Sequence, residues 1–299
     1  MKGYVKTGLM FTAVFLVVTL FSLWLAWPVV TETTVTQTMP GAIQGGMWDG
    51  ILTLIGGIFA VTIVFLLLIY FGLQRFIIGF MIFAMFWLAA GAILFTVIRI
   101  QDEITLFGVI LSVCLAGGMV AWGYRKKDAL MLNIVGGLGI AWAAASLGSS
   151  FSPLTAVIIL DILAAYDAIS VYGTKHMLTL AKGIAAGGMP IGVMIFGNPR
   201  GQPLDFNVPR TQRTWQVLGW GDIAIPGVFV VSANLAPFAR LPGGLTFMSA
   251  GALVGAVAGF FLLGWIAERF PRPGHAGLPP LIGCAEVGAV IGWLIGMFL

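Results

Sequence analysis

Charged residues are scarce in this chain. Only 9% of its 299 residues are Asp, Glu, Lys or Arg, while 60% are hydrophobic. A soluble domain carries about 25% charged residues, so a water-facing fold could not cover this much apolar surface. The net charge of +4 is small, and no basic helix lies outside the apolar stretches. We therefore exclude a soluble globular protein and expect no nucleic-acid partner.

Cysteine and histidine are also rare, with two of each. Cys114 and Cys284 lie far apart in the sequence and within apolar segments. This placement argues against a disulfide framework and against a cysteine-bound metal. The sequence has no cluster of His and Cys and no glycine-rich phosphate loop, so we expect neither a metal nor a cofactor.

Long apolar stretches are abundant instead. A helix needs about 20 apolar residues to cross a bilayer. The first stretch is longer than the apolar core of a signal peptide, about 7–15 residues, and we expect it to remain as a membrane helix. Nine stretches meet the length requirement: 8–30, 50–71, 76–98, 104–123, 129–148, 154–173, 214–235, 244–266 and 279–298. The sequence thus predicts an all-α polytopic membrane protein with nine transmembrane helices.

The basic residues orient these helices. With the N-terminus in the cytoplasm, 13 of the 15 Lys and Arg residues lie on the cytoplasmic side, and only Arg99 and Arg240 lie outside. Cytoplasmic loops carry such an excess, and nine spans then place the C-terminus outside. The long connection 182–213, rich in Gly and Pro, faces the cytoplasm. We expect segment 1–150 to be a scaffold of five helices, and segment 151–299 to carry the chemistry together with this loop.

Two aspartates interrupt neighbouring apolar stretches. Asp167 lies in 158–171 and Asp222 in 215–229, and an ionisable side chain inside a bilayer is costly and usually functional. Lys175 follows Asp167 by eight residues, and Arg213 precedes Asp222 by nine. At about 1.5 Å rise per residue, both carboxylates lie roughly 12–13 Å inward from a cytoplasmic charge. The matching depths indicate that the two acids act as a pair.

Paired carboxylates suit peptide hydrolysis. Two carboxylates in contact share one proton, so the ionised member can deprotonate water while the protonated member polarises a carbonyl. Asp167 and Asp222 are thus candidates for general base and general acid, in either order. Gly219 and Gly221 precede Asp222 and would let another backbone approach closely. The alternative is that each aspartate is a buried group bonded to polar neighbours.

Two further acids and one tyrosine lie near these positions. Asp161 is six residues before Asp167, which is about 240° around a helix, so we expect it to bond a neighbouring helix or line a water path. Glu286 lies two turns beyond Pro279, where it would supply protons or make a structural bond. Tyr166 would either hydrogen-bond near the pair or pack between helices.

Glycines also recur at every fourth position in the last two stretches: Gly251, Gly255 and Gly259, then Gly288, Gly292 and Gly296. Small residues at this spacing allow membrane helices to approach closely. We expect the last two spans to pack tightly against each other. The pattern leaves homo-oligomerisation open.

The order Tyr166-Asp167, then Gly219-x-Gly221-Asp222, resembles the YD and GxGD signatures of the presenilin/signal peptide peptidase family of intramembrane aspartyl proteases. The run 166–177 is similar to the archaeal presenilin homologues. A third motif of that family, Pro-Ala-Leu, begins its ninth helix. The corresponding residues here are Pro279-Pro280-Leu281, with Pro280 in place of Ala.

The resemblance implies that Asp167 and Asp222 are the catalytic pair and that Tyr166 supports them. It implies substrate contacts at Gly219, Gly221, Pro279, Pro280 and Leu281. Substrates would be transmembrane helical segments of membrane proteins, or remnant signal peptides, cleaved within the lipid bilayer. The family's loop between the sixth and seventh helices pairs with the unwound substrate, and 189–196 would be the pairing strand, although it could equally be a surface loop.

Two other functions remain open from the residues alone. A proton-coupled transporter or channel would use Asp161, Asp167, Asp222 and Glu286 as a relay, although such proteins usually show two matching halves that this chain lacks. A prepilin-type peptidase also uses GxGD. Those enzymes lack the YD motif with a long loop and often carry a cysteine-rich module that is absent here.

Overall fold

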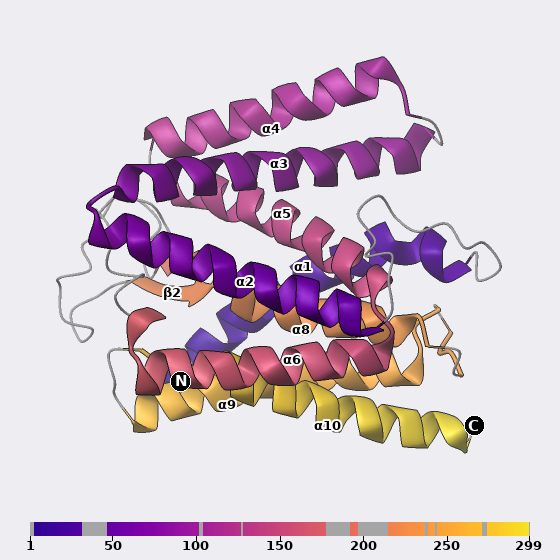
Figure 1. The fold of residues 1–299 in the computed structure, drawn as a ribbon. Coiled ribbons are helices and arrows are strands. Elements are labelled where there is room, and N and C mark those ends of the chain that lie inside the picture. Colours follow the sequence, from indigo (N-terminus) through magenta and orange to yellow (C-terminus); the bar gives the residue numbers. More distant parts are fainter. Residues whose placement is uncertain are drawn as a thin grey trace. The chain divides into compact units, whose positions relative to one another are not determined.

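The structure is a computed structural model, and it describes residues 3–31, 47–101, 104–126, 128–177, 192–196, 215–236, 239–242, 244–270 and 274–298. Within these ranges it contains nine α-helices, a π-helical turn and a two-stranded ribbon (Figure 1). The helices are α1 (Gly3–Thr31), α2 (Met47–Tyr70), α3 (Gln74–Gln101), α4 (Leu106–Lys126), α5 (Ala129–Ser150), α6 (Pro153–Ala168), α8 (Trp220–Asn234), α9 (Phe247–Arg269) and α10 (Leu278–Met297); the π-turn is η1 (Ile169–Gly173), and the strands are β1 (Gly192–Phe196) and β2 (Trp215–Gly219).

Among the residues that the structure describes, eight helical segments are long and apolar enough to cross a membrane: α1 to α5, α6 with η1, α9 and α10. They confirm eight of the nine predicted spans. The predicted helix 214–235 was wrong at its start, because Trp215–Gly219 is a strand and α8 has 15 residues. At about 1.5 Å per residue, α8 is roughly 22 Å long. Glycines at 219 and 221 weaken a helix here, and pairing with β1 supplies the backbone bonds instead.

The helices group into two compact units. One contains Met1–Ala60, Ala143–Lys175 and Gly221–Leu299, and the other contains Val61–Trp142 and His176–Trp220. Both aspartates and α10 belong to the first unit. The predicted division at residue 150 separates segments by their role: residues 1–150 as the scaffold and residues 151–299 as the segment that carries the chemistry. That division stays a prediction.

Glycines bring α9 and α10 together in the first unit, where the two helices lie side by side (Figure 1). A Cβ at Gly255 would collide with the carbonyl of Cys284, and one at Gly251 would collide with the carbonyl of Gly288. The predicted tight packing of the last two spans is thereby confirmed. On the other side of α9, the ring of Phe15 from α1 packs at 5.0 Å from that of Phe260.

Helix α8 is the most enclosed helix of this unit, with every residue from Pro226 to Asn234 buried. Polar side chains fix its C-terminal half by bonds to backbone groups. Ser232 Oγ donates to the carbonyl of Phe151 at 2.8 Å, and Ser249 Oγ donates to the carbonyl of Val230 at 2.9 Å. Asn234 Oδ1 accepts from the N–H of Thr246 at 2.8 Å. These bonds hold α8, and with it Asp222, against the α5–α6 corner and α9.

The second unit contains α3, α4, most of α5 and the β1–β2 ribbon. Ala89, Ala116, Val120 and Val135 form its small-residue core. The strands pair antiparallel, with Gly192 opposite Gly219 and Phe196 opposite Trp215. Of the predicted strand 189–196, residues 192–196 are therefore a strand, and 189–191 lie outside the described residues. Most of the loop 182–213 lies outside them too.

Candidate active site

Asp167 lies at the end of α6, where the helix changes its winding. Ser152 begins the helix: its side-chain oxygen accepts from the N–H of Thr155 at 3.2 Å, and Pro153 follows at the first helical position. After Ala168 the chain continues as the π-turn η1, and Ser170 Oγ donates back to the carbonyl of Asp167 at 2.9 Å. π-turns within helices are frequent at functional sites. Here the π-turn directly follows the helical turn that carries the carboxylate.

Asp222 lies in the first turn of α8, directly after the strand β2. The first N–H groups of a helix have no intrahelical partner, and the helix dipole favours an anion there. Pro226 has no N–H to offer the carbonyl four residues earlier, that of Asp222. The backbone around Asp222 is therefore less constrained than in a regular helix, while the residues after it are fully packed.

Both carboxylates lie against Gly277 at the start of α10. The N–H of Leu278 donates to Asp167 Oδ2 at 3.1 Å, and the N–H of Gly277 also interacts with this carboxylate. Asp222 lies against Gly277 from its own side. A Cβ at Gly277 would be 2.7 Å from Asp222 Cγ and Oδ1 and 2.9 Å from Oδ2. The structure thus brings the YD, GxGD and Pro-Pro-Leu segments together at one point.

Gly277 is the site residue that the sequence analysis missed. It is buried, and it precedes the first helical residue of α10 with no side-chain cap. Since the cap has no side chain, the carboxylate of Asp222 can lie directly against the backbone. No spacing rule marks this glycine, because its neighbour Asp222 comes from a helix 55 residues earlier in the chain.

The two tyrosines near Asp167 have different surroundings. The ring of Tyr166 packs edge-on against Phe59 of α2, with centroids 4.9 Å apart. Tyr172 in η1 accepts a hydrogen bond at its hydroxyl from the N–H of Ala276 at 3.2 Å. The sixth span therefore holds residues 276–278 by polar contacts from two side chains, those of Tyr172 and Asp167.

The Pro-Pro-Leu segment is fixed from behind by α9. Leu281 is fully buried, and Pro279 and Pro280 are partly buried. A Cβ at Gly259 would be 2.9 Å from Leu281 Cα and 2.9 Å from the carbonyl oxygen of Pro280. Because α9 approaches this closely, the N-terminus of α10 has little freedom to move away from the carboxylates.

The two glycines of the GxGD motif differ in their environment. Gly219 ends β2 and pairs with Gly192. Gly221 is exposed, and the nearest atom to a Cβ placed there is Ile225 Cδ1 at 3.9 Å. Among the described residues, nothing fills the space beside Gly221, so an extended backbone could approach Asp222 there.

Asp161 and Glu286 lie near each other, away from Gly277. Asp161 on α6 is exposed, and it interacts electrostatically with Glu286 on α10. Glu286 Oε1 is buried and has no hydrogen-bond partner in the part of the chain that is described. Two carboxylates repel each other when both are ionised, so their proximity does not bind α6 to α10.

This arrangement provides the elements of acid–base hydrolysis. Two carboxylates are held at one helix N-terminus, whose N–H groups stabilise negative charge. Gly221, next to Asp222, is exposed, and α9 packs closely against the first turn of α10. Paired carboxylates of this kind can activate water without a metal.

Comparisons with known proteins agree with this chemistry. Residues 12–299 match the family described as signal-peptide peptidase, presenilin aspartyl protease. A solved structure of a presenilin family intramembrane aspartate protease, in the C222 space group, is 28% identical with a TM-score of 0.65, covering 97% of this chain and 98% of that chain. A second such structure, in the P2 space group, is 27% identical with a TM-score of 0.61, covering 95% and 96%. No curated protein sequence matches the chain.

The transporter and prepilin-peptidase hypotheses gain no support from these comparisons. The family match covers nearly the whole chain, and the fold resemblance extends over the same length. The chain is therefore an integral membrane protein that belongs to the signal-peptide peptidase/presenilin family of intramembrane aspartyl proteases.

Proposed function

We propose that Asp167 and Asp222 are the catalytic pair, and that they hydrolyse peptide bonds within transmembrane segments of membrane proteins or remnant signal peptides. The observation that carries the proposal is the convergence of both carboxylates on Gly277. One carboxylate takes a proton from water, and the resulting hydroxide attacks the scissile carbonyl carbon. The other carboxyl donates its proton to the carbonyl oxygen, which gives a tetrahedral gem-diol. The first carboxyl, now protonated, then donates its proton to the amide nitrogen, and the second takes a proton back from a gem-diol hydroxyl as the C–N bond breaks and the amine leaves.

The substrate has to unwind before this attack, because a helix shields its own carbonyls. The space beside Gly221 supports an extended substrate next to Asp222. The ribbon β1–β2 supports the same idea, since no third strand pairs with it among the described residues. A two-stranded ribbon is marginally stable alone, and an added strand supplies main-chain bonds. We infer that the unwound segment adds to an outer edge of this ribbon.

The remaining predicted contacts have narrower roles. Pro279 and Pro280 lie in the first turn of α10 and have no N–H groups. They therefore donate no hydrogen bond to the neighbouring backbone carbonyls, which leaves those carbonyls available to a substrate. Leu281 holds the turn by burial. Tyr166 supports Asp167 indirectly, by fixing its helix against Phe59.

The test uses the purified full chain in proteoliposomes with a single-span helical substrate. We expect Asp167→Asn and Asp222→Asn each to abolish cleavage, and transition-state analogues of aspartyl proteases to inhibit the wild type. Asp161→Asn is the matched control, since it removes the same charge from the same helix away from Gly277. Retention of full cleavage by either of the first two variants would disprove the assignment.

A further inference from the structure

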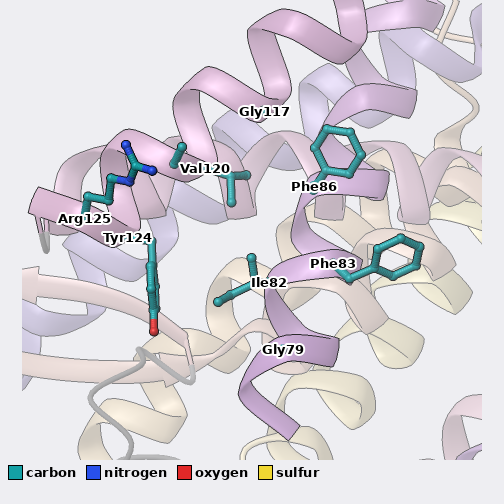
Figure 2. Close-up of a pocket in the computed structure, with 9 residues that line it drawn as sticks. Gly79, Ile82, Phe83, Phe86, Gly117, Val120, Tyr124 and Arg125 are labelled. Carbon is teal, nitrogen blue, oxygen red and sulfur yellow. The ribbon is translucent and has the colours of Figure 1, made fainter. Parts of the chain in front are cut away.

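An open groove of about 450 Å³ lies between helices α3 and α4 in the second unit (Figure 2). Its volume is within the range of ligand sites, about 300–1,000 Å³. Figure 2 shows the rings of Phe83 and Phe86 at one end and the side chains of Tyr124 and Arg125 at the other. The groove contains neither aspartate, so the proteolytic activity does not explain it.

Two glycines create the groove. A Cβ at Gly79 would meet nothing within 4 Å, and a Cβ at Gly117 would meet only Phe86 Cε2, at 3.6 Å. The hollow therefore exists because these two positions lack side chains and no neighbour has moved in to fill it. Phe83 beside it is 60% exposed.

The groove lies along membrane-spanning helices. Both α3 and α4 are candidate spans, and α4 ends with Arg125 and Lys126. From Gly117 to Arg125 is eight residues, about 12 Å along the helix axis. By the distribution of basic residues, this basic end is the cytoplasmic end. The groove thus runs from the cytoplasmic headgroup region into the hydrocarbon core.

Within the described ranges, the positive charge at the open end of the groove is not neutralised by an ion pair. No carboxylate of the described residues forms an ion pair with Arg125, whose guanidinium fork is suited to bind a phosphate. Lys126 has a different environment, over the ring of Trp122 at 5.9 Å. An apolar groove with one unpaired cation at its polar end complements a molecule with an acyl chain and a negative headgroup.

We propose that the α3–α4 groove binds an anionic phospholipid of the cytoplasmic leaflet, with an acyl chain against Phe83 and Phe86 and the phosphate on Arg125. The cytoplasmic leaflet is the side where anionic lipids attract basic residues next to transmembrane helices. A zwitterionic lipid would fill the groove without preferring Arg125, and a partner helix would not need a cation at this end.

The experiment uses full-length protein in phosphatidylcholine nanodiscs that contain phosphatidylglycerol with a diazirine on one acyl chain. After illumination, peptide mass spectrometry locates the label. We expect labelling to concentrate on 74–101 and 106–126, and unlabelled phosphatidylglycerol to displace the probe while unlabelled phosphatidylcholine does not.

Two matched pairs of variants test the proposal. Arg125→Ala should reduce labelling of these helices about fivefold, the effect of one cation near an anionic surface, while Lys126→Ala should not. Gly117→Leu should fill the groove and remove the labelling. Gly118→Leu is its control, because a Cβ there meets nothing within 4 Å and Gly118 does not line the groove.

Competition by phosphatidylcholine equal to that by phosphatidylglycerol would overturn the proposal, since it would mean annular contact only. Equal losses in the two members of either pair would overturn it as well. Labelling that is spread evenly over all spans would also overturn the proposal. The proposal would be overturned, too, if a second protein chain, and not unlabelled lipid, displaced the probe from the groove.

Discussion

Glycines have opposite effects at two places in this protein: around α10 in the first unit, and at the α3–α4 groove in the second. In the first unit, a side chain at Gly251, Gly255 or Gly277 would collide with a neighbouring helix or with the carboxylate of Asp222. In the second unit, a side chain at Gly79 would meet nothing within 4 Å, and one at Gly117 would only touch Phe86. The same residue type therefore permits close approach around α10 and leaves a hollow between α3 and α4. Three glycine substitutions test this comparison, and a fourth substitution, at Tyr172, tests the contact beside Gly277.

The largest effect is expected for Gly277→Ala. The added Cβ would be 2.7 Å from Asp222 Cγ, so the carboxylate has to move, and a displacement of about 1 Å can reduce a rate about 100-fold. Cleavage of a single-span substrate measures it. Gly283→Ala on the same helix is the control, because its Cβ meets nothing within 4 Å. Wild-type activity in Gly277→Ala would contradict the convergence of the carboxylates on this residue.

A smaller effect, on stability, is expected for Gly255→Ala. Its Cβ would collide with the carbonyl of Cys284 and push α9 from α10, and such overpacking costs about 1–3 kcal/mol. Thermal unfolding in detergent should show a lower midpoint for this variant and an unchanged one for Gly283→Ala. An unchanged midpoint for both would mean that α9 and α10 are farther apart than described.

Next in size is Tyr172→Phe. The variant removes the hydroxyl that accepts from the buried N–H of Ala276. The loss of one such bond costs about 1 kcal/mol, so we expect cleavage to fall several-fold with little change in expression. Tyr166→Phe provides the comparison, since it keeps the ring that packs on Phe59. Equal activity in Tyr172→Phe and the wild type would show that this contact does not position residues 276–278.

The smallest effect is expected for Gly79→Ala. No atom lies within 4 Å of the new methyl group, and Ala is favoured over Gly inside a helix by about 1 kcal/mol. The unfolding midpoint should therefore stay the same or rise slightly, with cleavage unchanged. A marked destabilisation would mean that the α3–α4 groove is closed in the native protein.

The sequence predicted most of the helices because their apolar stretches are long enough to span a bilayer. It failed at 214–235, where hydropathy cannot distinguish an apolar strand from an apolar helix and where the pairing partner β1 is distant in the chain. It named Asp167, Asp222 and the Pro279–Leu281 segment as parts of one site. Their catalytic and substrate-binding roles stay predictions, to be tested by the substitutions at Asp167 and Asp222.

Composition and periodicity alone determined that this chain crosses a membrane many times and that the last two spans pack through glycines, and they predicted that two acids lie at matching depths. These properties depend on residues near one another in the chain. Only the tertiary structure placed Gly277 against Asp222, brought Asp161 near Glu286 and left a hollow between α3 and α4. Each of these depends on helices that are distant in sequence or on the space between side chains, which no local pattern contains.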